Sequence, residues 1–204
     1  EGFGPFASEI YRMPMAYPFR FNGDAANCAA QTLDEVTHKI EKEIGAKNVA
    51  AIVIEPIQGE GGFIVPPKGF LPALSKYSTE NGIIFIADEV QTGFARLGHH
   101  WWGFEMYDVI PDIVITGKCI GNGHPMAAVI CTEEVANQFD NGMEFFSSFG
   151  GNPVSCEIGN AVIEVIEEEN LKLNAADTGD YFIDQLEVLK AEFDCIGDIR
   201  GLGF

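Results

Sequence analysis

The chain has 204 residues, 47% of them hydrophobic, and carries a formal net charge of -19 at pH 7. This size and apolar content suffice for one domain with a buried core and the beginning of another. The strong negative charge argues against nucleic acid and anionic lipid as partners, because both are bound by basic patches. No apolar run reaches the length of a membrane-spanning helix, so we expect no membrane association.

Five cysteines are scattered along the chain, and none of them forms a C-x-x-C pair. An odd number of unpatterned cysteines favours reduced thiols that mostly fill the core of a protein from a reducing compartment. We therefore expect a cytoplasmic protein. The chain starts without a methionine and stops at residues 201–204 in what reads as the middle of an element, so we expect a fragment of a longer polypeptide.

Helical spacing of apolar residues alternates along the chain with short apolar runs of strand length. Asn81 and Gly82 form a typical helix stop, and Asn152 and Pro153 a typical helix start. The alternation predicts an α/β fold with a mostly parallel sheet and flanking helices. We predict helices at residues 33–44, 70–80, 133–139, from 152 onward and at 178–193, and strands at 49–54, 83–87, 113–116 and 126–131.

The last two predicted helices each carry an apolar face that we expect to point inward. These faces consist of Val154, Ile158, Ala161, Val162 and Val165 in one helix and of Phe182, Leu186, Leu189 and Phe193 in the other.

Two of the predicted strands end next to residues that can carry chemistry. The run at 83–87 is followed by Asp88, and the run at 113–116 is followed by Gly117 and Lys118. Ligands of open α/β sheets bind outside the carboxyl ends of the strands. An acid and an amine there suit pyridoxal phosphate, which needs a lysine for its Schiff base and a carboxylate facing its pyridine nitrogen. Alternatively, Asp88 only caps a turn and Lys118 is a solvated surface lysine.

Two nucleotide-binding folds also place carboxylates or glycines after buried strands. A P-loop NTPase needs G-x-x-x-x-G-K-[ST], but Asp112 stands where the first glycine belongs and Cys119 where Ser or Thr belongs. The glycine pairs at 59–61 and 121–123 are not completed to the dinucleotide-binding G-x-G-x-x-G. His99 and His100 could bind a metal, but no nearby Cys or carboxylate completes a ligand set, so we expect no metal site.

Four separated blocks together resemble the signature segments of the class III aminotransferases, which are pyridoxal-phosphate enzymes of fold type I. The blocks are IEPIQGEGG at 54–62, IADEVQTGF at 86–94, GKCIGNGHP at 117–125 and FGGNP at 149–153. They occur in the order found in the family. The resemblance implies that residues 1–172 are part of the large cofactor-binding domain. Residues 173–204 would begin the small C-terminal α+β domain.

The resemblance also implies a role for each residue of a cofactor site. Lys118 would form the internal Schiff base and then act as general base, and Asp88 would face the protonated ring nitrogen. Gln91 would donate to the ring oxygen, and Val90 would pack against the ring face.

Three further residues are assigned by the resemblance alone. Ser147 and Ser148 lie where the family places a hydroxyl residue that reaches the cofactor phosphate of the neighbouring subunit, so the family likeness implies a homodimer with shared active sites. Glu60 matches the glutamate that pairs with a mobile arginine and switches the pocket between amine and carboxylate substrates. A plain polar turn is the alternative for the two serines.

The family contains two reactions that fit these blocks. Residues 121–125, 141–146, 149–156 and 196–201 resemble the alanine–glyoxylate-aminotransferase-like branch, which includes phospho-lyases acting on ethanolamine phosphate. Residues 55–62 keep the pattern of ordinary ω-amine transaminases. We favour a transaminase that moves an amino group from an amine or ω-amino acid to a 2-oxo acid, with the phospho-lyase as alternative and an inactive fragment as a third possibility.

Overall fold

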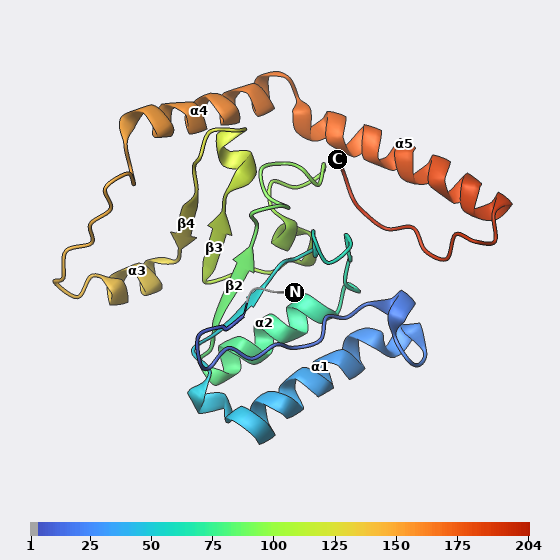
Figure 1. Cartoon of the computed structure of the whole chain (residues 1–204), viewed down its shortest axis with the longest axis horizontal. Coiled ribbons are helices and arrows are strands. Elements are labelled where there is room, and N and C mark those ends of the chain that lie inside the picture. Colours follow the sequence, from blue (N-terminus) through green and yellow to red (C-terminus); the bar gives the residue numbers. More distant parts are fainter. Residues whose placement is uncertain (1–3) are drawn as a thin grey trace.

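A four-stranded sheet lies at the centre of the computed structural model, which describes residues 4–204 (Figure 1). The strand order is β1-β2-β3-β4; the first three strands are parallel, and β4 runs antiparallel to β3. The strands are β1 (Ala51–Ile54), β2 (Ile84–Asp88), β3 (Ile113–Thr116) and β4 (Ala128–Cys131). Each falls within or beside a predicted strand, and the predicted α/β fold with a mostly parallel sheet is confirmed.

Five α-helices accompany the sheet in the described part of the chain. They are α1 (Cys28–Lys39), α2 (Phe70–Asn81), α3 (Glu133–Phe139), α4 (Pro153–Glu168) and α5 (Leu171–Glu192). Figure 1 shows α1 and α2 on one side of the molecule and α4 and α5 on the side toward which β2 and β3 point. Within residues 4–204, no helix combines the length and the apolar character needed to cross a membrane.

The main core lies between α1, α2 and β2. Phe70 and Leu71 of α2 and Phe85 of β2 are 2% exposed or less, and they pack with Val36 of α1 in one apolar cluster. Gly82 ends α2 in the left-handed conformation with φ of 65°, which glycine adopts without steric cost. This packing anchors the amino-terminal side of the sheet and leaves its carboxyl edge free for a site.

The predicted orientation of α5 is wrong. The helix begins at Leu171, seven residues before the predicted start, and Phe182 and Phe193 are 60% and 51% exposed. Its contact face consists of small residues instead. A Cβ placed on Gly179 would collide with the carbonyl oxygen of Gly203, so only a glycine permits this close approach.

The prediction for α4 is correct only in part. Val154 and Val165 of the expected inward face are 67% and 44% exposed, whereas Ile166 is buried. Gly159 is also buried, and the Met126 side chain approaches it so closely that a Cβ there would lie 2.9 Å from the methionine methyl group. This contact fastens α4 to the loop that precedes β4.

The cysteines are all free, as expected, but most of them do not fill the core. Cys28 is fully buried and Cys119 partly buried. The prediction of core filler is wrong for the three exposed cysteines, which are Cys131, Cys156 and Cys195. Cys131 lies in β4 and Cys156 in α4. Both elements also expose large apolar side chains, such as Val129 and Val154.

Candidate active site

Asp88 and Lys118 lie at the ends of neighbouring parallel strands. Asp88 is the last residue of β2 and pairs in register with Ile115 of β3, and Lys118 follows the end of β3 by two residues. The half-buried Asp88 accepts a hydrogen bond from the Val90 backbone N–H at 3.1 Å through one carboxylate oxygen. The other oxygen makes no hydrogen bond within residues 4–204, so it can receive a donor.

The Lys118 side chain is exposed, and its ammonium group contacts Gln91, which is also a predicted site residue. Its Nζ donates to Oε1 of Gln91 at 2.8 Å. The Lys118 backbone has φ of 40°, in the left-handed region that lysine rarely adopts. Backbone strain of this kind persists only where the surrounding structure holds it, and it clusters at functional sites. Here the short 3-10 helix Lys118–Gly121 packs beneath α4, which holds the lysine in place.

Gly59 fixes the position of the Gln91 amide. A Cβ at Gly59 would lie 2.6 Å from Cδ of Gln91, so any larger residue would displace the amide from its present place. The Glu55 carboxylate in turn accepts the Gly59 N–H at 3.1 Å. Sequence reasoning placed both residues in a signature block without assigning them a role. The only signal was a glutamate and a glycine four positions apart after a strand.

Glu89 is a second residue whose role the sequence did not reveal. It is 1% exposed and accepts hydrogen bonds from the N–H groups of Gly103 and Phe104 and from the Thr92 hydroxyl. Burial raises the pKa of the Glu89 carboxyl, against the opposing effect of these three hydrogen bonds. The carboxylate thus fastens the loop after β2 to a segment 14 residues further on, beside the site.

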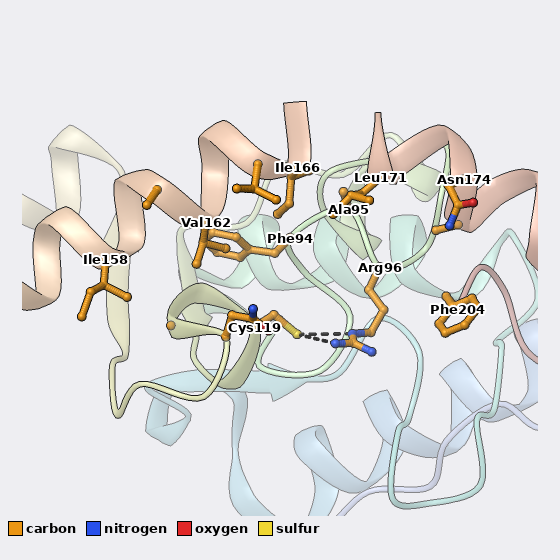
Figure 2. A pocket seen from close by; sticks show the side chains of 15 residues that line it. Phe94, Ala95, Arg96, Cys119, Ile158, Val162, Ile166, Leu171, Asn174 and Phe204 are labelled. Carbon is orange, nitrogen blue, oxygen red and sulfur yellow. Dashed lines mark hydrogen bonds between the residues drawn. The ribbon is translucent and has the colours of Figure 1, made fainter. Parts of the chain in front are cut away.

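Two adjoining cavities lie beyond the strand ends. The first, of about 540 Å³, is lined by Lys118, Gln91 and Gly59 together with residues of the loops around them. Asp88 and Val90 are not among its lining residues, and Glu60 is exposed outside it. The second cavity, of about 530 Å³, lies against α4 and α5 (Figure 2). The two share Arg96, Cys119, Asn122 and Phe204.

Ser147 and Ser148 are not brought to Lys118 within this chain. They belong to the segment 140–151, whose residues are all exposed, and neither lines a cavity. The Ser147 hydroxyl accepts the Gly150 N–H at 3.0 Å in a local turn. Figure 1 shows the connection between α3 and α4 extending away from the sheet.

No metal centre is evident in the part of the chain that the structure describes. It contains no group of three or more His, Cys, Asp or Glu side chains arranged to hold an ion. The His99 imidazole instead lies 3.9 Å from the Asp180 carboxylate on the surface. The available groups at the strand ends are thus a carboxylate, an amine and an amide, which suit an organic cofactor.

A mostly parallel sheet that presents an acid and a lysine at its carboxyl edge is the arrangement expected of an α/β enzyme with a lysine-linked cofactor. The chain belongs to the class III aminotransferases, because the family model described as "Aminotransferase class-III" matches residues 1–204.

Two named relatives illustrate the similarity. Human mitochondrial alanine–glyoxylate aminotransferase 2 is 51% identical over 203 residues, which are 98% of this chain and 39% of the human protein. The 4-aminobutyrate aminotransferase of Mycobacterium leprae is 44% identical over 206 residues, which are 100% of this chain and 46% of that protein. The chain therefore spans less than half the length of these relatives.

Solved structures agree with the family. An (S)-enantioselective omega-transaminase from Thermomicrobium roseum superposes with a TM-score of 0.91 at 35% identity, covering all of this chain and 46% of the other. An amine transaminase from an uncultivated Pseudomonas species, solved in its PLP-bound form, superposes with a TM-score of 0.90 at 31% identity; the match covers 99% of this chain and 47% of that one. The family thus implies pyridoxal phosphate.

The residues present fit that cofactor. Asp88 offers a free carboxylate oxygen at a strand end, as a pyridinium nitrogen requires. Lys118 offers a solvent-accessible primary amine next to a cavity, and the Gln91 amide lies within hydrogen-bond distance of it.

Proposed function

We propose that the protein is a pyridoxal-phosphate-dependent aminotransferase that moves an amino group from an amine or ω-amino acid to a 2-oxo acid. The observation that carries this proposal is the convergence of Asp88, Gln91 and Lys118 on two neighbouring strand ends, with Lys118 already bonded to Gln91. The relatives named above are aminotransferases, which supports the reaction class. Because the chain spans less than half of their length, the activity is proposed for the full-length protein.

Lys118 is the proposed attachment point of the cofactor, through a Schiff base of its Nζ. When bound, pyridoxal phosphate withdraws electrons from the substrate carbon next to the amino group and so makes its proton removable. Lys118 then takes and returns that proton as the general base. The Gln91 contact and the held backbone conformation fix the position of Lys118, and proton transfer would require Nζ to lie within hydrogen-bond reach of the reacting carbon.

Asp88, Gln91 and Val90 orient the cofactor ring. The carboxylate of Asp88 stabilises the positive charge of the ring nitrogen, a charge-assisted hydrogen bond that contributes about 1.5–3 kcal/mol. The Gln91 amide donates to the ring oxygen, and Val90 packs against the ring face. Gly59 supports this role, because the absence of a Cβ leaves the space that the Gln91 amide occupies.

Ser147 and Ser148 are proposed to bind the cofactor phosphate of a partner subunit in a homodimer. Their segment is exposed and lines neither cavity, which supports an intermolecular contact. The neighbouring Phe145, Phe146 and Phe149 are 77%, 83% and 86% exposed. Apolar side chains of this size are rarely left in water over a contiguous segment, and obligate dimer interfaces bury such residues.

Several finer assignments stay predictions. Glu60 is proposed as the substrate gate; it is exposed and directly follows Gly59, which lines the lysine cavity. The division into a large domain through residue 172 and the start of a small domain at 173 is a further proposal. A cytoplasmic location is expected from the reduced cysteines, although the human relative is named as mitochondrial.

A phospho-lyase acting on ethanolamine phosphate is the second candidate, since residues 121–125, which resemble the branch that includes such lyases, closely follow the lysine. Within this block, His124 Nε2 lies 2.7 Å from the Ser155 hydroxyl at the start of α4. Release of inorganic phosphate from ethanolamine phosphate, without formation of an amino acid from a 2-oxo acid, would favour the lyase.

Borohydride reduction tests the cofactor attachment. The full-length holoenzyme is reduced and digested, and the peptides are analysed by mass spectrometry. We expect the pyridoxyl group on the peptide that contains Lys118. Labelling of Lys68 or Lys76 instead, which lie in the chain between β1 and β2, would overturn the assignment. A Lys118→Ala holoenzyme provides the control and should retain no reducible label.

A further inference from the structure

His124 is a polar residue of the loop 117–125 that the proposed mechanism does not use. It is half-buried, and its Nε2 lies 2.7 Å from the Ser155 hydroxyl in the first turn of α4. The His124 backbone N–H donates to the Gly121 carbonyl at 2.9 Å, and Gly121 is the last residue of the short helix that begins at Lys118. His124 therefore joins the loop of the reactive lysine to the start of α4.

The Ser155 hydroxyl also belongs to the cap of α4. It accepts a hydrogen bond from Nδ2 of Asn152 at 2.9 Å, and the Asn152 side-chain oxygen accepts the Ser155 N–H at 2.9 Å. Asn152 is the N-cap residue, so this pair fixes the point at which the helix begins. A hydroxyl that accepts from Asn152 keeps its own proton and can donate it to Nε2 of His124. The three side chains form one hydrogen-bonded row, His124–Ser155–Asn152.

The same asparagine holds the segment that carries the two proposed phosphate ligands. Nδ2 of Asn152 also donates to the Phe149 carbonyl at 2.8 Å. Phe149 directly follows Ser148, and the Ser147 hydroxyl accepts the Gly150 N–H at 3.0 Å. The exposed segment is thereby tied at its carboxyl end to the hydrogen-bonded row.

The two ends of the row differ in how firmly they are packed. Gly159 of α4 is buried against Met126, and a Cβ on Gly121 would lie 3.2 Å from Cβ of Met126, so α4 and the loop of His124 meet closely. Residues 140–151 are all exposed. Because only one end is packed, loss of the row should mainly change the position of the exposed segment.

We propose that His124 is a positioning residue for the cofactor phosphate site of the partner subunit. Through Ser155 and Asn152 it holds the segment that presents Ser147 and Ser148. This inference rests on the proposed function, in which those two hydroxyls bind the phosphate of the cofactor in the partner. Removal of the row should therefore weaken cofactor binding in the other subunit and not in the subunit that carries the change.

Mixed dimers with a single Lys118 test this role, because the absorbance of the Schiff base then reports one site only. Two affinity tags isolate dimers of two different full-length chains. In the first dimer, a Lys118→Ala/His124→Ala chain is paired with wild type, so the remaining lysine site takes its serines from the chain without His124. The Kd of pyridoxal phosphate should rise about 3- to 10-fold relative to the reference dimer of Lys118→Ala with wild type, the effect of one lost hydrogen bond.

The second dimer exchanges the two changes between the chains. Lys118→Ala is paired with His124→Ala, so the only lysine and the missing histidine belong to the same chain. The Kd should equal that of the reference dimer. A rise here that matches or exceeds the rise in the first dimer would overturn the proposal, because His124 would then act on the lysine of its own chain. An unchanged Kd in both dimers would overturn it as well.

Further variants in the first dimer separate positioning from a general loss of structure. Glutamine can bring an amide group near the place of Nε2, so His124→Gln should recover most of the affinity. Ser155→Ala should reproduce the loss, and adding it to His124→Ala should weaken binding no further, because both changes break the same row. Additive losses would contradict a shared row. His38→Ala is the matched control and should leave the Kd unchanged, since His38 is exposed in α1, which Figure 1 shows on the opposite side of the molecule from α4.

Ser148→Asp in place of His124→Ala in the first dimer tests the proposed function separately. The added negative charge should repel the phosphate and raise the Kd in the partner site more strongly. No effect of this change would overturn the shared site of the proposed function. An effect of Ser148→Asp without an effect of His124→Ala would overturn only the role of His124.

Discussion

Two regions of this chain differ in how far their side chains are exposed. In the strands and loops that carry Asp88 and Lys118, Ala87 and Thr116 are fully buried, and the Asp88 and Lys118 side chains each make a hydrogen bond within the chain. In the segment from α3 to α5, large apolar residues such as Phe145 and Phe149 stay in solvent. The difference indicates that the first region completes its own structure, whereas the second needs a surface supplied from elsewhere.

The strongest test of this difference asks whether the exposed segment completes the site of a partner. Lys118→Ala should lose turnover by about 10⁴-fold, and Ser148→Asp should weaken phosphate binding through charge repulsion. When the two full-length variants exchange subunits, one site of each mixed dimer inherits both defects and the other neither. Activity should recover to about a quarter of the wild-type value, because half of the dimers are mixed and half of their sites are intact.

Mass spectrometry of the intact assemblies verifies the exchange. Each variant mixed with itself is the control and should recover nothing. No recovery after demonstrated exchange, or a strictly monomeric active enzyme, would show that Ser148 serves only its own chain.

Asp88 and Asp112 are two carboxylates beside the same sheet, and replacing each by asparagine compares their roles. Asp88 ends β2, whereas Asp112 precedes β3 and accepts the Phe85 N–H at 2.7 Å. Asp88→Asn should lower kcat about 10²- to 10³-fold, because the ring nitrogen loses its anionic partner. Asp112→Asn keeps an oxygen acceptor and should stay close to wild type. Steady-state kinetics at saturating cofactor measure both. Near-normal turnover of Asp88→Asn would make the strand-end carboxylate structural.

Replacement of Glu89 tests how far the stability of the first region depends on one buried carboxyl group. In Glu89→Gln, one carboxylate oxygen becomes an amide nitrogen that cannot accept the N–H of Gly103 or Phe104, so stability should fall by about 1–3 kcal/mol. The denaturation midpoint of the full-length protein measures this loss. Glu80→Gln is the control, since its exposed ion pair with Lys76 contributes about 0–1 kcal/mol.

The loss of stability in Glu89→Gln should depend on pH. The folded-state pKa of Glu89 is raised above the ordinary value of 4.5, so the folded protein holds this proton when the unfolded chain has lost it. The stability contributed by Glu89 is thus present at pH below 4.5 and is lost as the pH rises through the raised pKa. The stability gap between wild type and Glu89→Gln should narrow with rising pH. A gap that widens would mean that the three hydrogen bonds outweigh burial.

Replacement of Gly59 is expected to have the smallest effect of these changes, a loss of cofactor affinity. Gly59→Ala should displace the Gln91 amide and raise the Kd of pyridoxal phosphate about tenfold, which corresponds to about 1.4 kcal/mol. Absorbance titration of the apoenzyme measures it. At Gly69 an added Cβ meets no atom within 4 Å, so Gly69→Ala is the matched control and should bind the cofactor normally. Equal affinities in the two variants would remove Gly59 from the site.

Most of the sheet and the position of its reactive edge could be predicted from the sequence. Buried parallel strands read as continuous apolar runs, and the four runs were found within a few residues of the observed strands. The contact face of α5 could not be predicted in this way. Helical periodicity shows which residues share a face, but here Ala175, Ala176 and Gly179 make the contact because they allow a loop backbone to approach.

The sequence by itself determined the α/β class, the family, and the delivery of Asp88 and Lys118 to one edge, because parallel strands that pair in order have their ends side by side. Tertiary structure alone decided the groups that shape the cavities. Arg96 meets Cys119 across 23 residues, and Glu89 meets Phe104 across 15. Such contacts depend on the paths of loops in space, and no local spacing of residue types specifies those paths.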